Sequence, residues 1–478
     1  MYRNFRKPKP CRRKRFVQSL QDHIIFTFSI ASMNGLIHVV RSKRLLFERF
    51  LWIVLLVAGL SGAIQQTLQA WRRYDERPVV ITVEKDFFNW LVEFPSVIIC
   101  LGDMDLNLKK KLIPYLNERN ISFNEQDIEE YVNDLMFNTY LTYSSLEKYA
   151  NGSKVDIVPA HLYLEVANII SGRISSDSDK KNTRGAVETN WPKNVEDRYS
   201  LIMTEFGVCH CFHSELSIYF DIESLINNVT FNSTFQSITR NYKEKEILLN
   251  QKKIYKHYLL FVTTPTDMID ITSHYFRATD TLILLSSLNI LDIVSDDDLK
   301  YLSPSHRNCK FSNEIEGLEY SHIYSYNLCR IECRMRLCVK YCNCTPYYYR
   351  RNGEPVCNMT GMYCLSKHPE LITLIDPQTE DILCSCLQNC NDQVVNLEID
   401  SASPWFLDST LTISFNTFPT ERYRRSLIFS KTDLLIQAGG LFGLFLGCSV
   451  ISFIEIPYFF TLRFIWGVFG KRSIKPEV

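Results

Sequence analysis

Two long apolar segments, separated by residues 70–433, constrain this chain more than any other feature. The first covers residues 50–69, between Arg49 and the pair Arg72-Arg73, and the second covers residues 434–464. About 20 apolar residues in a helix cross a bilayer, so the sequence predicts two membrane-spanning helices. A third apolar run, residues 281–294, is shorter and contains serines and Asp292, which indicates a buried strand or helix instead.

Basic residues set the expected orientation of the two spans. Residues 1–49 contain twelve Lys or Arg against Asp22 and Glu48, and further basic residues follow the second span. Cytoplasmic flanks are enriched in Lys and Arg, so residues 1–49 and 465–478 are expected in the cytoplasm. The basic run at residues 12–15 could instead be a nuclear signal or a contact with anionic lipid, but a topology determinant is the favoured reading. The sequence therefore predicts a multi-pass plasma-membrane protein in contact with lipid, with no nucleic-acid partner.

Cysteines and glycosylation sequons both concentrate between the two spans. Fourteen of the 16 cysteines lie between Cys100 and Cys390, and eleven of those between Cys309 and Cys390. Such density indicates disulfides formed in an oxidising compartment. Six sequons occur in the same stretch, at Asn120, Asn151, Asn228, Asn232, Asn343 and Asn358. Residues 70–433 are therefore predicted to be a glycosylated, disulfide-rich extracellular domain.

The pattern of the extracellular stretch predicts an α+β domain. Residues 107–150 place apolar positions at helical spacing, whereas residues 256–294 and 391–418 are rich in β-branched and aromatic residues and are expected to form strands. Residues 175–185 are small and charged and are expected to form an exposed loop.

Motifs of enzymes and metal sites are missing from the sequence. It contains no HExxH, GxSxG or Walker motif and no zinc-spaced Cys/His quartet. The pairs Cys342-x-Cys344 and Cys384-x-Cys386 are spaced too closely for a zinc knuckle. We expect no enzyme activity, no cofactor and no bound metal.

The second apolar segment has an unusual composition for a simple anchor. Gly439, Gly443 and Gly447 recur every four residues, which would line one face of a continuous helix. Small residues in this pattern permit either a tight helix contact in a bundle or a narrow pore. The order Gly447-Cys448-Ser449 favours the pore, because a free backbone beside a hydroxyl suits oxygen-dipole coordination of a cation.

Two polar residues further along the segment extend the pore hypothesis. Ser452 would lie one helical step beyond Ser449, and Glu455 would place a carboxylate about 30 Å from Leu434 at 1.5 Å per residue. An ionisable residue within a span indicates function, and a ring of glutamates from several subunits would favour cations. Ser452, Glu455 and Gly443 are therefore predicted to line the pore or its vestibule.

These residues resemble the degenerin/epithelial sodium channel family, in which Gly-x-Ser precedes an acidic position in the second span. Further strings carry the resemblance: FPSVIIC at residues 94–100, GVC at residues 207–209 followed by Phe212, and the cysteine series from Cys309 to Cys390. FPTERYRRSLIFSKTDLL before the second span and YFFTLR after the filter are most similar to the insect pickpocket branch. The resemblance covers nearly the whole chain in order.

The resemblance implies a trimer of two-span subunits with a hand-like domain of palm, finger, knuckle, thumb and β-ball. It implies sodium conduction with amiloride block, in a homotrimer or a heterotrimer with related subunits. By motif, Gly447, Cys448 and Ser449 form the selectivity filter, and Ile436, eleven residues earlier, occupies a gating position. It also implies six disulfides: Cys100–Cys209, Cys309–Cys390, Cys329–Cys386, Cys333–Cys384, Cys342–Cys364 and Cys344–Cys357.

The sequence departs from the family at four places. A cytoplasmic His-Gly that matters for gating is Asn34-Gly35 here, and Asn cannot titrate. The aromatic residue that couples thumb to membrane in other branches is His306, and the middle filter residue is Cys448. Cys211 and Cys338 lie outside the family's pairs, and a seventh bridge between them is one reading.

Three other hypotheses compete with an independently conducting channel. The first is a regulatory subunit that works only in a heteromeric channel, which Asn34 and Ile436 would support. The second is a two-span scavenger receptor of the class B type, which needs no Gly-x-Ser. The third is an ATP-gated channel, which would need more membrane-proximal lysines than this chain has. The sequence does not indicate the gating stimulus.

Overall fold

The computed structural model describes residues 35–40, 45–102, 108–171, 187–189, 199–227, 235, 237–244, 246–254, 257–350, 353–375, 383–407 and 409–463. The chain divides into two compact units: residues 1–80 with 427–478, and residues 81–426. The second unit falls within the predicted extracellular stretch, residues 70–433. The loop expected at residues 175–185 lies outside the described residues.

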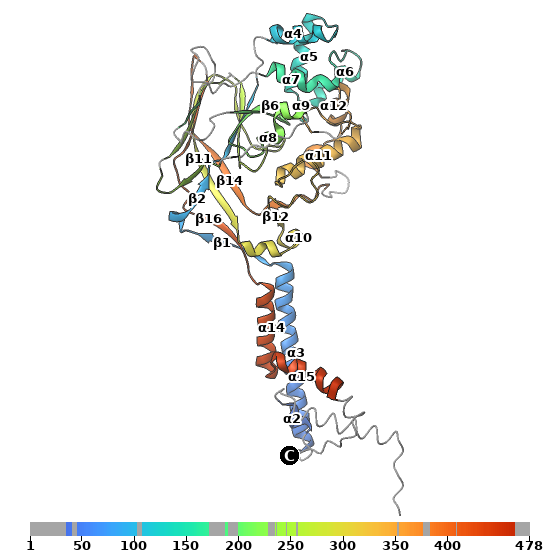
Figure 1. Cartoon of the computed structure of the whole chain (residues 1–478), viewed down its shortest axis with the longest axis vertical. Coiled ribbons are helices and arrows are strands. Elements are labelled where there is room, and N and C mark those ends of the chain that lie inside the picture. Colours follow the sequence, from blue (N-terminus) through green and yellow to red (C-terminus); the bar gives the residue numbers. More distant parts are fainter. Residues whose placement is uncertain are drawn as a thin grey trace, which may run out of the picture. The chain divides into compact units, whose positions relative to one another are not determined.

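The first unit contains the apolar segments. The helix α3, 31 residues long, is longer at both ends than the predicted span of residues 50–69. Among the described residues it is the one helix that is long and apolar enough to cross a membrane. It packs beside α14 (Figure 1). The described helices of this unit are α2 (Leu36–Val40), α3 (Leu46–Glu76), α14 (Lys431–Leu446), α15 (Val450–Tyr458) and η5 (Phe459–Arg463), the last a π-helix.

The second apolar segment is not a continuous helix, and the prediction of one over residues 434–464 is wrong. The helix α14 ends at Leu446 and α15 begins at Val450. Gly447 ends α14 because its φ of 65° lies in the left-handed region, which glycine enters without steric cost. The pattern of apolar residues continues through the break, so it could not reveal the interruption.

The second unit is built around two β-sheets. The larger has the strand order β1-β16-β11-β15-β8-β4, with β14 paired to the other side of β11 (Figure 1). The smaller has the order β10-β9-β3-β6-β5. The larger sheet comprises β1 (Val79–Glu84), β4 (Val187–Thr189), β8 (Ile247–Ile254), β11 (Leu282–Ser295), β14 (Asp392–Pro404), β15 (Ser409–Phe415) and β16 (Arg422–Leu427); the smaller comprises β3 (Ser96–Leu101), β5 (Ser200–Thr204), β6 (Gly207–Phe212), β9 (Tyr258–Thr263) and β10 (Phe276–Ala278).

The strand β3 separates two hydrophobic cores. Its side chains alternate between opposite faces of the sheet. Ile98 and Cys100 belong to a core shared with the helices, whereas Val97 and Ile99 belong to a core shared with residues of the larger sheet. The smaller sheet is therefore covered on both faces, which explains why β3 is an unbroken apolar string.

Helices and short elements complete the second unit. The expected helices within residues 107–150 are confirmed, and so are strands in residues 256–294 and 391–418, with the third apolar run forming β11. The α-helices are α4 (Leu108–Glu118), α5 (Glu125–Phe137), α6 (Glu147–Ala150), α7 (Tyr163–Ile170), α8 (Ser217–Phe220), α9 (Ile222–Asn227), α10 (Pro304–Arg307), α11 (Tyr326–Cys342), α12 (Met359–Ser366) and α13 (Glu370–Thr373). Two-stranded pairs join β2 (Leu91–Glu93) to β7 (Thr239–Asn241) and β12 (Cys309–Lys310) to β13 (Gln388–Asn389), and 3-10 turns are η1 (Phe87–Asn89), η2 (Tyr143–Leu146), η3 (Ala160–Leu162) and η4 (Asp297–Tyr301).

Six disulfides join the cysteine pairs that the family resemblance implied. Three of them tie α11 to segments that follow it in the chain, and a fourth, Cys344–Cys357, lies directly after the helix. Because α11 and its partners are crosslinked along most of the helix, the thumb-like region is held by covalent bonds as well as by packing.

The proposed seventh bridge between Cys211 and Cys338 is wrong. Both are buried free thiols. The sulfur of Cys211 lies 3.4 Å from the hydroxyl of Ser96, and that of Cys338 lies 3.2 Å from the hydroxyl of Tyr140. Each thiol therefore fills a position in the core beside a polar partner.

The structure describes four of the six predicted glycosylation sites, and all four asparagines are exposed: Asn120, Asn151, Asn343 and Asn358. Asn228 and Asn232 lie outside the described residues. Exposure is what a glycan requires, so the four described positions stay good predictions.

Candidate functional site

The start of α14 is fixed by a capping box. The Ser430 hydroxyl accepts a hydrogen bond from the backbone of Asp433 at 3.1 Å, and the Asp433 carboxylate accepts one from the backbone of Ser430 at 3.0 Å. Two backbone N–H groups that the helix leaves unpaired are thus satisfied reciprocally. The helix that carries the predicted gating and pore residues therefore begins at a defined residue.

The end of α14 is a compact turn at Gly447. The Gly447 N–H donates to the carbonyl of Gly443 at 2.9 Å, and the Cys448 N–H donates to the carbonyl of Phe442 at 3.4 Å. A helix leaves its last four carbonyls without helical partners, here those of residues 443–446, and of these two bonds only the one to Gly443 uses that set. The turn therefore gathers carbonyl oxygens beside an exposed glycine.

Serine side chains start the next helix. The Ser449 N–H donates to the Ser452 hydroxyl at 3.1 Å, and the Ser452 N–H donates to the Ser449 hydroxyl at 3.3 Å. This is the reciprocal arrangement of a capping box with a second serine in place of an acid. Ser449 is exposed, whereas Ser452 is buried.

The close contact between α3 and α14 is made by glycines of α3. A Cβ atom on Gly59 would lie 3.1 Å from the carbonyl oxygen of Phe445, and one on Gly62 would lie 3.2 Å from the Phe445 ring. Gly439 and Gly440 of α14 have nothing of the described chain within 4 Å of such an atom. Within this chain, the small residues that permit close packing of the two helices are therefore glycines of α3. Gly439 and Gly440 of α14 make no such contact in the described chain.

The predicted filter and pore residues occupy the break and the two helices beside it. Gly447, Cys448 and Ser449 form the break, Gly443 lies one turn before it, and Ser452 and Glu455 lie on α15. Gly447 does not share a helical face with Gly439 and Gly443, so that part of the prediction is wrong. The break also invalidates the 30 Å separation expected between Leu434 and Glu455 along one helix.

Two predicted residues differ in exposure. Ile436, the predicted gating residue, is 71% exposed on α14. The Cys448 side chain is only 7% exposed and turns back toward the carbonyl of Leu446 at 3.8 Å. The backbone of Cys448 is therefore better placed than its thiol to contribute to a site. The filter assignment itself stays a prediction.

The remaining predicted gating residues lie in different places. Asn34 lies outside the described residues, and Gly35 has a φ of 93°, where an added Cβ atom would lie 3.3 Å from Leu56 and 3.4 Å from Trp52 of α3. His306 lies in α10 and is half-buried. The short α10 is part of the second unit, whereas Gly35 is part of the first.

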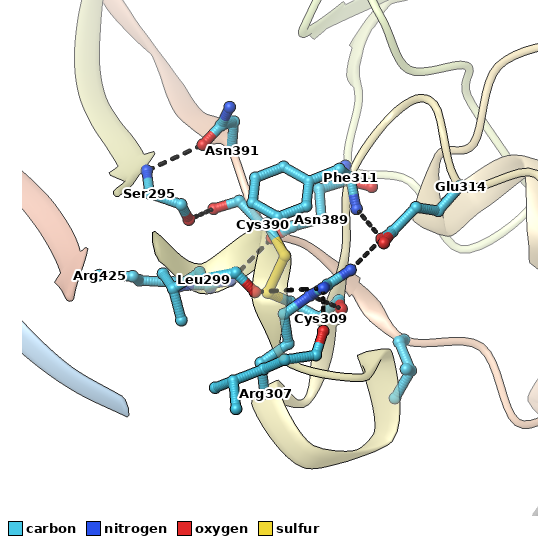
Figure 2. The surroundings of a disulfide bond; sticks show 12 residues. Ser295, Leu299, Arg307, Cys309, Phe311, Glu314, Asn389, Cys390, Asn391 and Arg425 are labelled. Carbon is cyan, nitrogen blue, oxygen red and sulfur yellow. Dashed lines mark hydrogen bonds and ion pairs between the residues drawn. A yellow bond between two sulfur atoms is a disulfide. The ribbon is translucent and has the colours of Figure 1, made fainter. Parts of the chain in front are cut away.

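Arg307, the residue after His306, makes buried contacts at the base of the thumb-like region (Figure 2). The Arg307 guanidinium is buried and donates to the carbonyls of Cys309 at 3.0 Å and Leu302 at 2.6 Å, and it also pairs with Glu314. The Cys309–Cys390 disulfide lies beside this group. Sequence reasoning singled out His306, but the buried contacts are made by Arg307.

A buried ion network connects α11 to the rest of the second unit. The guanidinium of Arg334 pairs with Glu205 and lies 3.3 Å from Asp270, which also receives Arg330 at 2.9 Å. Burial pushes the pKa of Asp270 upward, yet Arg334 and Arg330 outweigh it and hold the pKa below its ordinary value. Sequence reasoning missed this network, because nothing in the sequence marks which arginines of α11 face inward.

Buried His213 is neutral in the fold. Its Nε2 accepts a hydrogen bond from the backbone of Ile238 at 2.9 Å. Burial lowers the pKa of His213 to about 4. Acid therefore opposes folding at this position.

One cluster has ligand atoms close enough together to hold a metal ion, but a disulfide within the cluster argues against a metal site. Among the described residues, Cys342, Cys364 and His368 place ligand atoms within 4.8 Å of one another. Cys342 and Cys364 are joined as a disulfide, so neither offers a thiolate.

A long apolar helix, a second apolar segment broken at glycine, and a disulfide-rich domain between them define a class: membrane proteins with a large stapled ectodomain. The family model described as the amiloride-sensitive sodium channel matches residues 28–459. The chain belongs to this family, whose members are membrane-embedded ion channels and not enzymes.

Individual relatives are more distant. The chain is 28% identical to sodium channel protein Nach of Drosophila virilis over 194 residues, which is 37% of this chain and 49% of that protein. It is 27% identical to pickpocket protein 28 of Drosophila melanogaster over 189 residues, 34% of this chain and 31% of that protein. It is 24% identical to human acid-sensing ion channel 2 over 176 residues, 33% of this chain and 34% of that protein. The matches thus span half or less of these relatives.

Proposed function

We propose that this chain is a subunit of a sodium-selective cation channel, with the pore formed around the break at residues 447–449. The observation that carries the proposal is non-helical backbone within an apolar membrane segment. In a bilayer such backbone is tolerated only where it is buried in protein or lines a water-filled cavity. A simple lipid-facing anchor has no use for it.

The chemistry of the break suits a small cation. Gly447 and Ser449 are exposed, and the turn collects backbone carbonyls that α14 does not pair. Carbonyl and hydroxyl oxygens can replace the hydration shell of a cation. Selectivity would then come from the oxygens of several subunits around one axis, and Glu455 would concentrate cations near the filter without sorting them.

Assembly as a trimer is part of the proposal. Gly439 and Gly440 have no atom of the described chain near them, and Ile436 is largely exposed. Contacts with the same segment of other subunits would account for these open positions. Either three copies of this chain or a mixture with related subunits would satisfy this requirement. Amiloride block is proposed from the family and the relatives, and no gating stimulus is assigned.

We further propose a two-span topology in the plasma membrane, with both termini in the cytoplasm. The basic flanks and the exposed sequon asparagines support it. Glycosidase treatment should lower the apparent mass of the protein made in cells, and Asn151→Gln should remove one step of that change. Tags at either terminus should be detected only after permeabilisation. A tag detected on intact cells would contradict the topology.

Recording currents from cells that express the chain tests the function. Amiloride-sensitive inward sodium current from the chain alone would support an independently conducting subunit. Current that appears only when a relative is co-expressed, and that changes selectivity with Ser449 variants, would support a heteromeric pore. If the ion selectivity of the co-expressed channel is the same with every variant at residues 447–449, the alternative of a non-conducting regulatory subunit would be supported instead.

A further inference from the structure

A cavity of about 300 Å³ lies in the second unit where five segments meet. Its walls come from β2, the turn after β9, the end of β11, the residues before α11, and residues 389–393. It adjoins the Cys309–Cys390 disulfide, since Asn389 and Asn391 flank Cys390 and both line it (Figure 2). This volume is at the lower end of the range for small-molecule sites.

Three carboxylates line the cavity: Glu93, Asp292 and Asp392. They come from three different strands, β2, β11 and β14. Each is half-buried, and among the described residues no lysine, arginine or histidine lines the same cavity. The polar contacts recorded for Glu93 and Asp292 are neutral, a Ser237 hydroxyl and the Gln393 side chain.

Buried polar atoms without partners point to a missing ligand. Thr264 lines the cavity and is 6% exposed, and its hydroxyl has no hydrogen-bond partner among the described residues. The carbonyl oxygen of the Gln393 side chain, in the same wall, is buried and unpaired as well. Gln393 uses its NH₂ group on the carbonyl of Glu93 at 3.3 Å, so it presents an acceptor. Orphaned buried groups of this kind require an explanation, and a bound donor provides one.

The charges near the cavity leave it negative. Burial raises the pKa of Asp292 to about 6, which is still below neutral pH, and it also raises the pKa of Glu93 and of Asp392. Arg422 and Arg425 of β16 act on Asp292 and Asp392, but neither lines the cavity.

Both arginines are already engaged by other groups. Arg422 pairs with Glu84 at 2.6 Å, and Arg425 donates to the carbonyl of Asn389 at 2.8 Å. Glu215 acts on Glu93 as a further negative charge, whereas burial raises the pKa of Asp267 to about 7. The field inside the cavity therefore favours a cation.

We propose that this cavity binds a small organic cation carrying protonated amines. Ammonium groups are donors only, which matches walls whose free groups are acceptors. Apolar side chains of Leu91, Ile293 and Val294 line part of the cavity and suit a short carbon chain. A metal ion fits less well, because among the described residues no three carboxylate oxygens converge as metal ligands do. The proposal is independent of the pore.

The test measures the thermal unfolding midpoint of the full-length protein in detergent at pH 7.5. The probe is 1,4-diaminobutane, and the matched control is 1,4-butanediol, which has the same length and no charge. We expect the diamine to raise the midpoint saturably and the diol to leave it unchanged, because a ligand that binds only the native state stabilises it. No saturable rise with the diamine would overturn the proposal. So would a rise with calcium chloride alone, which would make the occupant a divalent cation.

Variants assign the effect to the cavity. The double variant Asp292→Asn with Asp392→Asn should weaken apparent binding at least tenfold without lowering the midpoint of the free protein, since each change removes a half-buried charge and keeps an oxygen that can accept the hydrogen bond from Gln393. Asp297→Asn is the control for net charge, because that side chain is 90% exposed and should bind the diamine as the wild type does. Thr264→Val keeps every carboxylate and should weaken binding by a few fold. Equal binding by the double variant and the wild type would show that the diamine binds elsewhere.

Discussion

The ectodomain and the α14–α15 segment differ in how many of their groups find a contact within the single chain. In the second unit, the six disulfides, the ion pairs of Arg334 and the N-terminal cap of α11 all form between groups of a single chain. In the first unit, α14 has nothing within 4 Å of a Cβ atom added at Gly439 or Gly440, Ile436 is 71% exposed, and the helix ends at the exposed Gly447. The ectodomain is complete as one subunit, whereas the membrane segment has the features of a part that needs copies around it.

This difference predicts where substitutions act. Changes in the ectodomain should alter the free energy of unfolding of each subunit. Changes around the break should alter assembly and ion passage and leave the ectodomain folded. The predictions below follow from this contrast.

The largest expected effect is at Arg334. Its side chain is fully buried between Glu205 and Asp270, so Arg334→Met should leave Glu205 without its cation and Asp270 with Arg330 alone. Breaking a buried pair on one side costs about 3–5 kcal/mol. We expect loss of surface expression, measured by surface biotinylation. The double variant Arg334→Met with Glu205→Gln should recover part of it, and equal loss in both variants would argue against the ion pair as the cause.

Cysteines provide the next comparison. Cys309→Ser with Cys390→Ser should lower the free energy of unfolding by about 2–4 kcal/mol, because the bridge closes a long loop. Cys211→Ser should cost less, since that thiol is free and already lies 3.4 Å from the Ser96 hydroxyl. Thermal unfolding of the purified ectodomain-containing protein measures both. A Cys211 variant as unstable as the double variant would mean that Cys211 is bridged.

The acid response of the ectodomain should depend on His213. Its pKa is about 4 in the fold because of burial, against an ordinary value near 6.5, so the unfolded chain takes up the proton first. The stability from neutral His213 is complete above pH 6.5 and is lost as pH falls toward 4, by up to about 3 kcal/mol. His213→Gln should reduce the change of the unfolding midpoint with pH over that interval. A midpoint with the same slope in the variant would place the response on other groups.

The same substitution in α3 and in α14 should have different effects on the single subunit. Gly59→Ala would place a methyl group 3.1 Å from the Phe445 carbonyl and should cost about 1–3 kcal/mol. Gly440→Ala meets nothing within 4 Å and should be neutral for the single subunit. Thermal unfolding in detergent compares them. If Gly440→Ala lowers the midpoint only in the assembled oligomer, a contact with another subunit lies there.

The sequence predicted the organisation of the chain better than its details. Apolar length predicted the candidate membrane helix α3, cysteine density predicted the stapled domain, and the family's cysteine spacing predicted all six bridges. The sequence analysis missed the break after Leu446 because apolar residues continue through it. Gly447 is nevertheless a typical residue at the end of a helix, and Ser449 with Ser452 is typical of the start of the next one. Cys211 and Cys338 were paired by elimination, which fails when a core accepts thiols as small apolar groups. Contacts such as Gly59 with Phe445 depend on which helix faces meet, and one sequence cannot specify that.

The most direct test of the account is the reversal potential under bi-ionic sodium and potassium conditions. Ser449→Asn enlarges the side chain at the break, and Ile451→Ala, at a 67% exposed position on α15, is the control. Both are measured in variants that reach the surface, with a relative co-expressed if the chain needs one. We predict that Ser449→Asn shifts the reversal potential toward zero, by roughly 60 mV for each tenfold loss of selectivity, and that Ile451→Ala does not. An unchanged reversal potential in a conducting Ser449 variant would contradict a filter at residues 447–449.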